Sequence, residues 1–154
     1  MVGAIIAARR DDPIEVYRRL DHAEELARFL GADENIGWTA FGPTNVRIHR
    51  LSAAVALADP SVALQESEKV DVTRIPVGLR GRQAQVHLDS AWAHTQLGED
   101  AEAVIHLLDI ERVAPELVRA NPNAHELIHT LMRRERRYRV PGLRGLAQRV
   151  GCAA

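Results

Sequence analysis

The chain shows a pattern of small and apolar residues that repeats every forty positions. Three alanines mark the repeat, and each is followed seven residues later by an apolar side chain: Ala23 by Leu30, Ala63 by Val70, and Ala103 by Ile110. The residue four positions after each alanine is also small or apolar: Ala27, Ser67 and Leu107. Such spacing places side chains on one face of a helix. The pattern therefore predicts a series of similar helices.

The third copy of the repeat indicates how its helices pair. Gly98 interrupts a helical pattern that resumes up to Val113, and Pro115 follows. Glycine at such an interruption favours a tight turn, and small residues at Ala91 and Ala103 let two helices approach closely. These small, turn-glycine, alanine and closing-proline positions resemble the tetratricopeptide (TPR) consensus. We therefore expect an all-α, TPR-like α-solenoid of antiparallel helical hairpins.

The same periodicity, followed along the whole chain, predicts eight helices. They cover 2–10, 13–30, 44–58, 60–70, 79–97, 100–113, 123–137 and 141–149. The main loops expected are Gly31–Pro43 and Asp71–Gly78, which contain both proline and glycine. No segment alternates apolar and polar residues for long enough to predict a strand. We predict a single domain over residues 1–154.

Composition limits the compartment and the partners. The net charge of −1 gives no general attraction to nucleic acid or to a membrane surface. Cys152 is the sole cysteine, so an internal disulfide is impossible and a reducing compartment fits. The apolar run after Met1 has no basic residue ahead of it and is far shorter than the ~20 residues of a membrane span. We predict a cytoplasmic protein with no membrane contact.

Several segments, taken together, resemble a known family. They are Trp38–Arg50, Asp71–Pro76, Leu88–Ala91, Glu111–Glu116 and Pro141–Ala147. As a set they are similar to the carboxy-terminal helical region of actinobacterial helix-turn-helix transcriptional regulators of the XRE type. In that family a DNA-binding domain precedes a TPR-like region that senses a ligand or a partner. The resemblance implies the sensor region of a longer regulator, without its DNA-binding domain. A stand-alone TPR-like adaptor is the alternative.

A candidate binding surface follows from the expected solenoid, in which the first helix of each hairpin lines a concave groove. Aligning the repeats pairs polar residues on two such helices, at Asn45, His49, Ser52 and at Gln85, Asp89, Trp92. Amide side chains can bond both polar groups of a peptide backbone, an aromatic ring can anchor a side chain, and an arginine can bind a carboxylate. The predicted ligand-binding residues are Trp38, Asn45, His49, Arg82, Gln85, Asp89 and Trp92. The expected ligand is a peptide, a protein or a small molecule.

Structural roles are the alternative for several of these residues. His49 and Asp89 would then hydrogen-bond each other across the hairpins and fix their packing. Trp38 and Phe41, in the long loop, would either flank the groove or pack the loop onto the core.

The segment His125-Glu126-Leu127-Ile128-His129 matches the H-E-x-x-H motif of zinc peptidases, in which the two imidazoles share a helix face and the glutamate acts as the base. Such a site needs a third protein ligand, and after His129 the chain offers only Glu135 and Cys152. We therefore predict an ordinary helix here, with a zinc-dependent hydrolase as the less favoured alternative. No catalytic residue, metal or cofactor is predicted. Four other histidines show no ligand-like spacing, and we expect them at the surface or in packing: His22, His87, His94 and His106.

Charge is divided unequally along the chain. From Ala120 onward seven arginines accompany two glutamates, whereas the preceding part holds thirteen basic and nineteen acidic residues. The arginines could contact phosphate, but only Tyr138 is aromatic there and no DNA-reading motif is present. We expect no specific DNA binding by this chain. A solvated last helix pair or a contact with an acidic neighbour is favoured; head-to-tail self-association and a homodimer are the alternatives.

Overall fold

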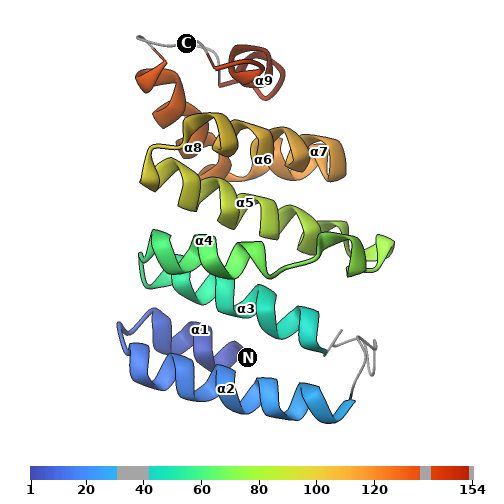
Figure 1. The fold of residues 1–154 in the computed structure, drawn as a ribbon. Helices are drawn as coiled ribbons and strands as arrows, with labels where there is room; N and C mark the ends of the chain where they lie inside the picture. Colours follow the sequence, from blue (N-terminus) through green and yellow to red (C-terminus); the bar gives the residue numbers. More distant parts are fainter. Residues whose placement is uncertain (31–41, 136–139, 153–154) are drawn as a thin grey trace. The chain divides into compact units, whose positions relative to one another are not determined.

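The computed structural model describes residues 1–30, 42–135 and 140–152, and every regular element in these ranges is helical. The chain divides into two compact units, Met1–Ile75 and Pro76–Ala154. Within each unit, helices that follow one another in the sequence pack together (Figure 1). The predicted all-α class is therefore confirmed for the described residues.

The first unit contains two helical hairpins and a short 3-10 turn. Its elements are α1 (Val2–Ala8), α2 (Pro13–Leu30), α3 (Pro43–Ala56), α4 (Pro60–Glu68) and η2 (Val72–Arg74). Helix α1 packs on α2 and α3 packs on α4, while α3 also contacts both α1 and α2. Val16 and Leu20 of α2 are fully buried against the alanines of α1 and Ala53 of α3. These apolar contacts join the two hairpins of the unit.

The second unit begins with the longest hairpin and adds three further helices. Its elements are η3 (Val77–Leu79), α5 (Arg80–Leu97), α6 (Asp100–Val113), α7 (Pro115–Ala120), α8 (Pro122–Arg134) and α9 (Leu143–Arg149). Helix α8 packs on α5, α7 and α9, and α7 also packs on α6. The core contains Leu107 and Ile110 of α6, Ile128 and Leu131 of α8, and Leu146 of α9, all without solvent exposure.

The three hairpins close through the same turn geometry. One residue in each turn has a positive φ angle: 55° at Asp11, 54° at Ala58 and 79° at Gly98. The amide of the following residue donates to the carbonyl five positions earlier, in the pairs Asp12–Ala7, Asp59–Ala54 and Glu99–His94, at 3.1, 3.0 and 2.9 Å. This is the Schellman arrangement, in which glycine is usual because a Cβ atom strains the left-handed region. In two of the three turns this position is not a glycine, and the backbone there is more strained than it would be with glycine.

The forty-residue repeat corresponds to the second helix of each hairpin. Ala23 lies in α2, Ala63 in α4 and Ala103 in α6, and their side chains are 6%, 0% and 0% exposed. A methyl group at a buried position leaves room for the partner helix, which a longer side chain would displace. The predicted helical hairpins are present in the described residues. Their stacking into a TPR-like solenoid stays a prediction.

Some helix boundaries differ from the predicted ones, and proline explains the largest difference. No helix was predicted between residues 113 and 123, but Pro115–Ala120 form α7. A first helical residue has no intrahelical partner for its amide, so proline is well suited to begin a helix. Proline also begins α2, α3, α4 and α8. None of the helices in the described ranges is both long and apolar enough to span a membrane.

Two smaller differences have local causes. The helix predicted over 2–10 ends at Ala8, because Asp11 takes the left-handed conformation of the turn. The loop predicted over 71–78 contains η2, whose first amides are capped by Asp71. The Oδ1 atom of Asp71 accepts from the Thr73 amide at 3.0 Å and from the Thr73 hydroxyl at 2.6 Å.

Candidate functional site

In the first unit, the predicted polar face of α3 is largely covered. Asn45 is only 4% exposed, and its Nδ2 atom donates to the sulfur of Met1 at 3.6 Å. The Nδ1 atom of His49 lies 3.0 Å from the carbonyl oxygen of Asn45, one helical turn earlier. The Oδ1 atom of Asn45 is buried and has no hydrogen-bond partner in the described ranges. An acceptor in this state is costly, because it has lost water without gaining a donor.

In the second unit, four of the predicted binding residues lie along α5. Gln85 donates from Nε2 to Oδ1 of Asp89 at 2.7 Å, so these two side chains do share a helix face as predicted. Asp89 is 5% exposed, and Trp92 is half-buried against the apolar core. Arg82, in the first turn of α5, is half-buried and holds a buried Nη1 atom without a partner in the part of the chain described.

The predicted groove combines residues of the two units, each of which is described by itself. The pairing of Asn45 with Gln85, and the alternative bond between His49 and Asp89, therefore stay predictions. Trp38 and Phe41 lie outside the described residues. Within each unit, the chain places the predicted polar residues near the beginning or middle of the first helix of a hairpin.

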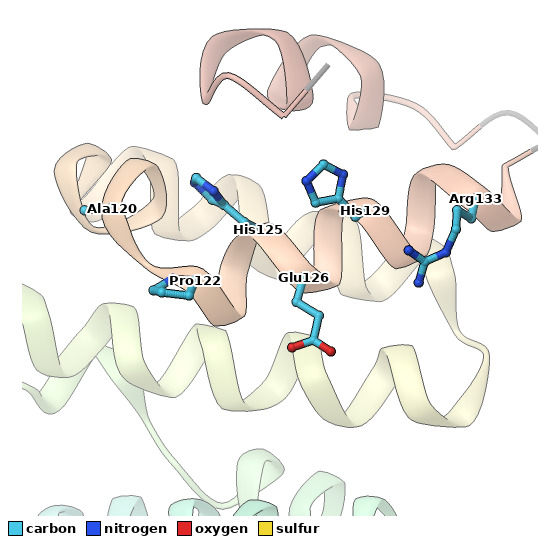
Figure 2. A pocket seen from close by; sticks show the side chains of 6 residues that line it. All are labelled: Ala120, Pro122, His125, Glu126, His129 and Arg133. Carbon is cyan, nitrogen blue, oxygen red and sulfur yellow. The ribbon is translucent and has the colours of Figure 1, made fainter. Parts of the chain in front are cut away.

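The H-E-x-x-H segment lies on α8 and lines an open pocket, drawn in Figure 2. His125 and His129 project from one side of the helix, whereas the carboxylate of Glu126 points to the other side (Figure 2). The Nε2 atom of His125 is buried and has no partner in the described ranges. Neither histidine belongs to the group of three metal-ligating side chains that the described residues bring together. The choice between an ordinary helix and a zinc-dependent hydrolase at this segment therefore stays a prediction.

That group of three lies in the α5–α6 hairpin and consists of His87, His106 and Asp109. The Nδ1 atoms of His87 and His106 are 3.1 Å apart, and the Nδ1 atom of His87 is 3.9 Å from Oδ2 of Asp109. His87 is 8% exposed, while His106 and Asp109 are half-buried. Two imidazoles and a carboxylate thus converge at the edge of the helix pair.

A third imidazole supports this cluster from the side. The ring of His94 stacks on that of His106, with centroids 5.3 Å apart and planes 21° from parallel. The Nδ1 atom of His94 lies 2.7 Å from Oε2 of Glu99, which holds the ring in place. His94 thereby limits the rotation of the His106 ring.

The cluster favours neutral imidazoles. Burial lowers the pKa of His106 to about 4, and the nearby His87 and His94 contribute in the same direction. Burial also lowers the pKa of His87, against the opposing effect of the Asp109 carboxylate. Both rings are therefore uncharged at neutral pH, the state in which a ring nitrogen can bind a metal.

The sequence predicts these histidines at the surface or in packing, because they show no ligand-like spacing along the chain. His87 and His106 lie on different helices. A usable signal was nevertheless present: His87 precedes the turn residue Gly98 by eleven positions and Asp109 follows it by eleven. Folding a hairpin about that glycine brings positions equally distant from the turn opposite each other.

Among the described residues after Ala120, the arginines are engaged in contacts within the second unit. Arg134 donates from Nη1 to the Thr95 carbonyl at 2.6 Å and to Oδ1 of Asp100 at 3.1 Å. Arg144 pairs with the buried Glu135 at 2.7 Å, and Arg149 forms two bonds with Glu111. These pairs fix α8 and α9 to the rest of the second unit. Arg136, Arg137 and Arg139 lie outside the described residues.

The fold defines an all-α protein built of consecutive helical hairpins. Comparison with protein-family models, curated proteins and solved structures gives no match. The resemblance to XRE-type regulators therefore stays a prediction.

Proposed function

We propose that this chain is a ligand- or protein-binding helical-repeat module of the TPR-like type, without enzymatic activity, and that it is the sensor region of a bacterial transcriptional regulator. The hairpins support the class of protein, because their second helices carry equivalent buried alanines and their turns share one geometry. Helical repeats of this kind present the first helices of their hairpins to a ligand.

The observation that carries the proposal is that Arg82 has a buried hydrogen-bond donor without a partner within the described part of the chain. Its Nη1 atom is buried without a partner in the described ranges, although the residue itself remains partly accessible. An arginine holds five donors in a rigid fork, and a carboxylate matches that fork. A buried donor of a charged group without an acceptor is costly, so an incoming carboxylate would gain more there than at an exposed arginine.

The expected ligand is therefore an extended peptide with a carboxylate, at its end or in an acidic side chain. Fluorescence anisotropy on the untagged chain, with a library of short labelled peptides that have free carboxyl ends, would find such ligands. Amidating the carboxyl end of each binding peptide would then show whether the carboxylate is the group recognised.

Variants of Arg82 test the assignment directly. Arg82→Met keeps most of the apolar stem and removes the charge, and we expect it to weaken binding by about tenfold or more. Gln96→Ala, at an exposed position of the same helix, is the matched control and should bind as the wild type does. Peptides that bind Arg82→Met and wild type equally, or a library without any binder, would contradict the proposal.

The regulator and the stand-alone adaptor differ in what surrounds this module. A helix-turn-helix encoded in the same reading frame ahead of Met1 would favour the regulator, and a frame that holds none would favour the adaptor. In both cases we propose that this chain does not itself bind DNA specifically. The internal pairing of Arg134, Arg144 and Arg149 supports that view, because these cations already have partners. Self-association into a homodimer is part of the same proposal, and sedimentation would test it.

A further inference from the structure

We propose that His87, His106 and Asp109 bind one divalent transition-metal ion, of the zinc class, at the edge of the α5–α6 hairpin. Each of these residues offers one ligand atom, and the three atoms all lie within 4.8 Å of one another. The site is separate from the peptide-binding function proposed above and from the H-E-x-x-H segment of α8.

The distances fit a single ion. Nitrogen ligands about 2.0–2.1 Å from a tetrahedral zinc lie about 3.3 Å from each other. The Nδ1 atoms of His87 and His106 are 3.1 Å apart, so small rotations of the two rings would place both at bonding distance from one metal. The Oδ2 atom of Asp109 is 3.9 Å from Nδ1 of His87, so it has to move closer to the two imidazoles to complete the set.

The neighbouring residues orient these ligands. Oδ1 of Asp109 accepts from Nε and Nη2 of Arg112 at 3.2 and 2.9 Å, which leaves Oδ2 turned toward the imidazoles. His94 stacks on His106 and is itself held by Glu99. Such outer contacts fix ligand orientation in metal sites and raise affinity. The positive charge of Arg112 acts in the opposite direction, so we expect binding weaker than that of a four-cysteine zinc site.

The donor set selects the type of metal. Two imidazole nitrogens with one carboxylate oxygen suit Zn²⁺, Co²⁺, Ni²⁺ or Cu²⁺, whereas Mg²⁺ and Ca²⁺ require oxygen donors. Three protein ligands leave a fourth position for water.

Because His87 lies on α5 and the other two ligands lie on α6, a bound ion joins the two helices. Metal binding is therefore expected to stabilise the hairpin in proportion to its affinity.

Cobalt provides the direct test, because four-coordinate Co²⁺ has visible absorption bands and zinc has none. The untagged chain, stripped with EDTA and dialysed, would be titrated with CoCl₂ and then with ZnCl₂. We expect one equivalent of Co²⁺ to bind with bands typical of a four-coordinate site, and one equivalent of Zn²⁺ to displace it. The thermal midpoint should rise with ZnCl₂ and should not rise with MgCl₂.

Variants distinguish this site from the other histidine pair. His106→Ala and Asp109→Asn should each weaken Co²⁺ binding by at least about tenfold. The double variant His125→Ala/His129→Ala, which removes the pair on α8, should bind as the wild type does. Asp109→Asn preserves shape at a partly exposed position, so its circular dichroism in EDTA should match that of wild type. The proposal is overturned by the absence of a stoichiometric complex, or by binding that is lost only in the α8 variant.

Discussion

Arg149 and Glu111 form an ion pair with two hydrogen bonds, and this pair attaches α9 to α6. The Nε–Oε1 and Nη2–Oε2 distances are both 2.7 Å, so the guanidinium and the carboxylate lie fork to fork. Glu111 belongs to the last turn of α6 and Arg149 ends α9. This geometry depends on the planar guanidinium, which the ammonium group of lysine cannot reproduce.

We therefore expect Arg149→Lys to loosen α9 although the charge is retained. Amide hydrogen exchange should become faster in α9 and remain unchanged in α2 and α3. Arg119→Lys is the matched control, because within the described residues Arg119 forms a single bond, of 3.2 Å, with Glu116 on its own helix. Equal exchange in α9 for wild type and Arg149→Lys would show that the second bond of the pair contributes nothing to docking.

The same pair predicts a dependence on pH. The Arg149 guanidinium holds the pKa of Glu111 below its ordinary value of 4.5. Protons therefore bind the unfolded carboxyl more readily than the folded one, and the stability that the pair contributes is fully present above pH 4.5. It is lost as the pH falls through the lower pKa of the folded state. Melting temperatures of wild type and Arg149→Met should differ at pH 7 and converge as the pH falls below 4.5; a constant difference would contradict the mechanism.

The turn between α3 and α4 offers a stabilising substitution. Ala58 has a φ angle of 54°, in the left-handed region where a Cβ atom costs roughly 1 kcal/mol. Glycine removes that strain but gives the unfolded chain more freedom, so we expect Ala58→Gly to raise the free energy of unfolding by a few tenths to about 1 kcal/mol. Chemical denaturation would measure it.

Two further variants serve as references for the predicted stabilisation by Ala58→Gly. Gln65→Gly, at an exposed position inside α4, should lower stability by about 1 kcal/mol, because glycine is a poor helix former. Gly98→Ala should also lower it, since Gly98 has a φ angle of 79° in the equivalent turn, where a Cβ atom is strained although it would meet no other atom. A destabilising effect of Ala58→Gly would mean that the strain is smaller than the entropy that glycine adds to the unfolded state.

The sequence predicted the helices well because their signals are local. The buried alanines at 23, 63 and 103 and the turn at Gly98 follow from the spacing of residues near one another in the chain. Helix α7 was missed because Pro115 lies where one helix ends and the next begins, and only the first of these roles was expected of it. A proline by itself does not say on which side of it the helix lies.

The metal-binding cluster depends on information that no single helix contains. His87 meets His106 and Asp109 only in the particular register that α5 and α6 adopt, and a shift by one residue would turn His106 away. The predicted binding residues show the converse. Gln85 and Asp89 were correctly placed on one face, but their spacing could not show that they would bond each other and that Asp89 would be covered.

The alanine that first revealed the repeat can be tested by enlarging it. Ala103 has no solvent exposure and lies in the core of the second unit, as does Ala91 of α5. Adding the three further carbon atoms of leucine in a close-packed core forces the neighbouring helices apart, and we expect Ala103→Leu to lower the free energy of unfolding by about 1–3 kcal/mol. Ala101→Leu, on the exposed face of the same helix, should change it by less than about 0.5 kcal/mol. Urea denaturation of both variants would separate the two positions. Equal stabilities would mean that the repeated alanine is a feature of composition and has no role in the packing of the hairpin.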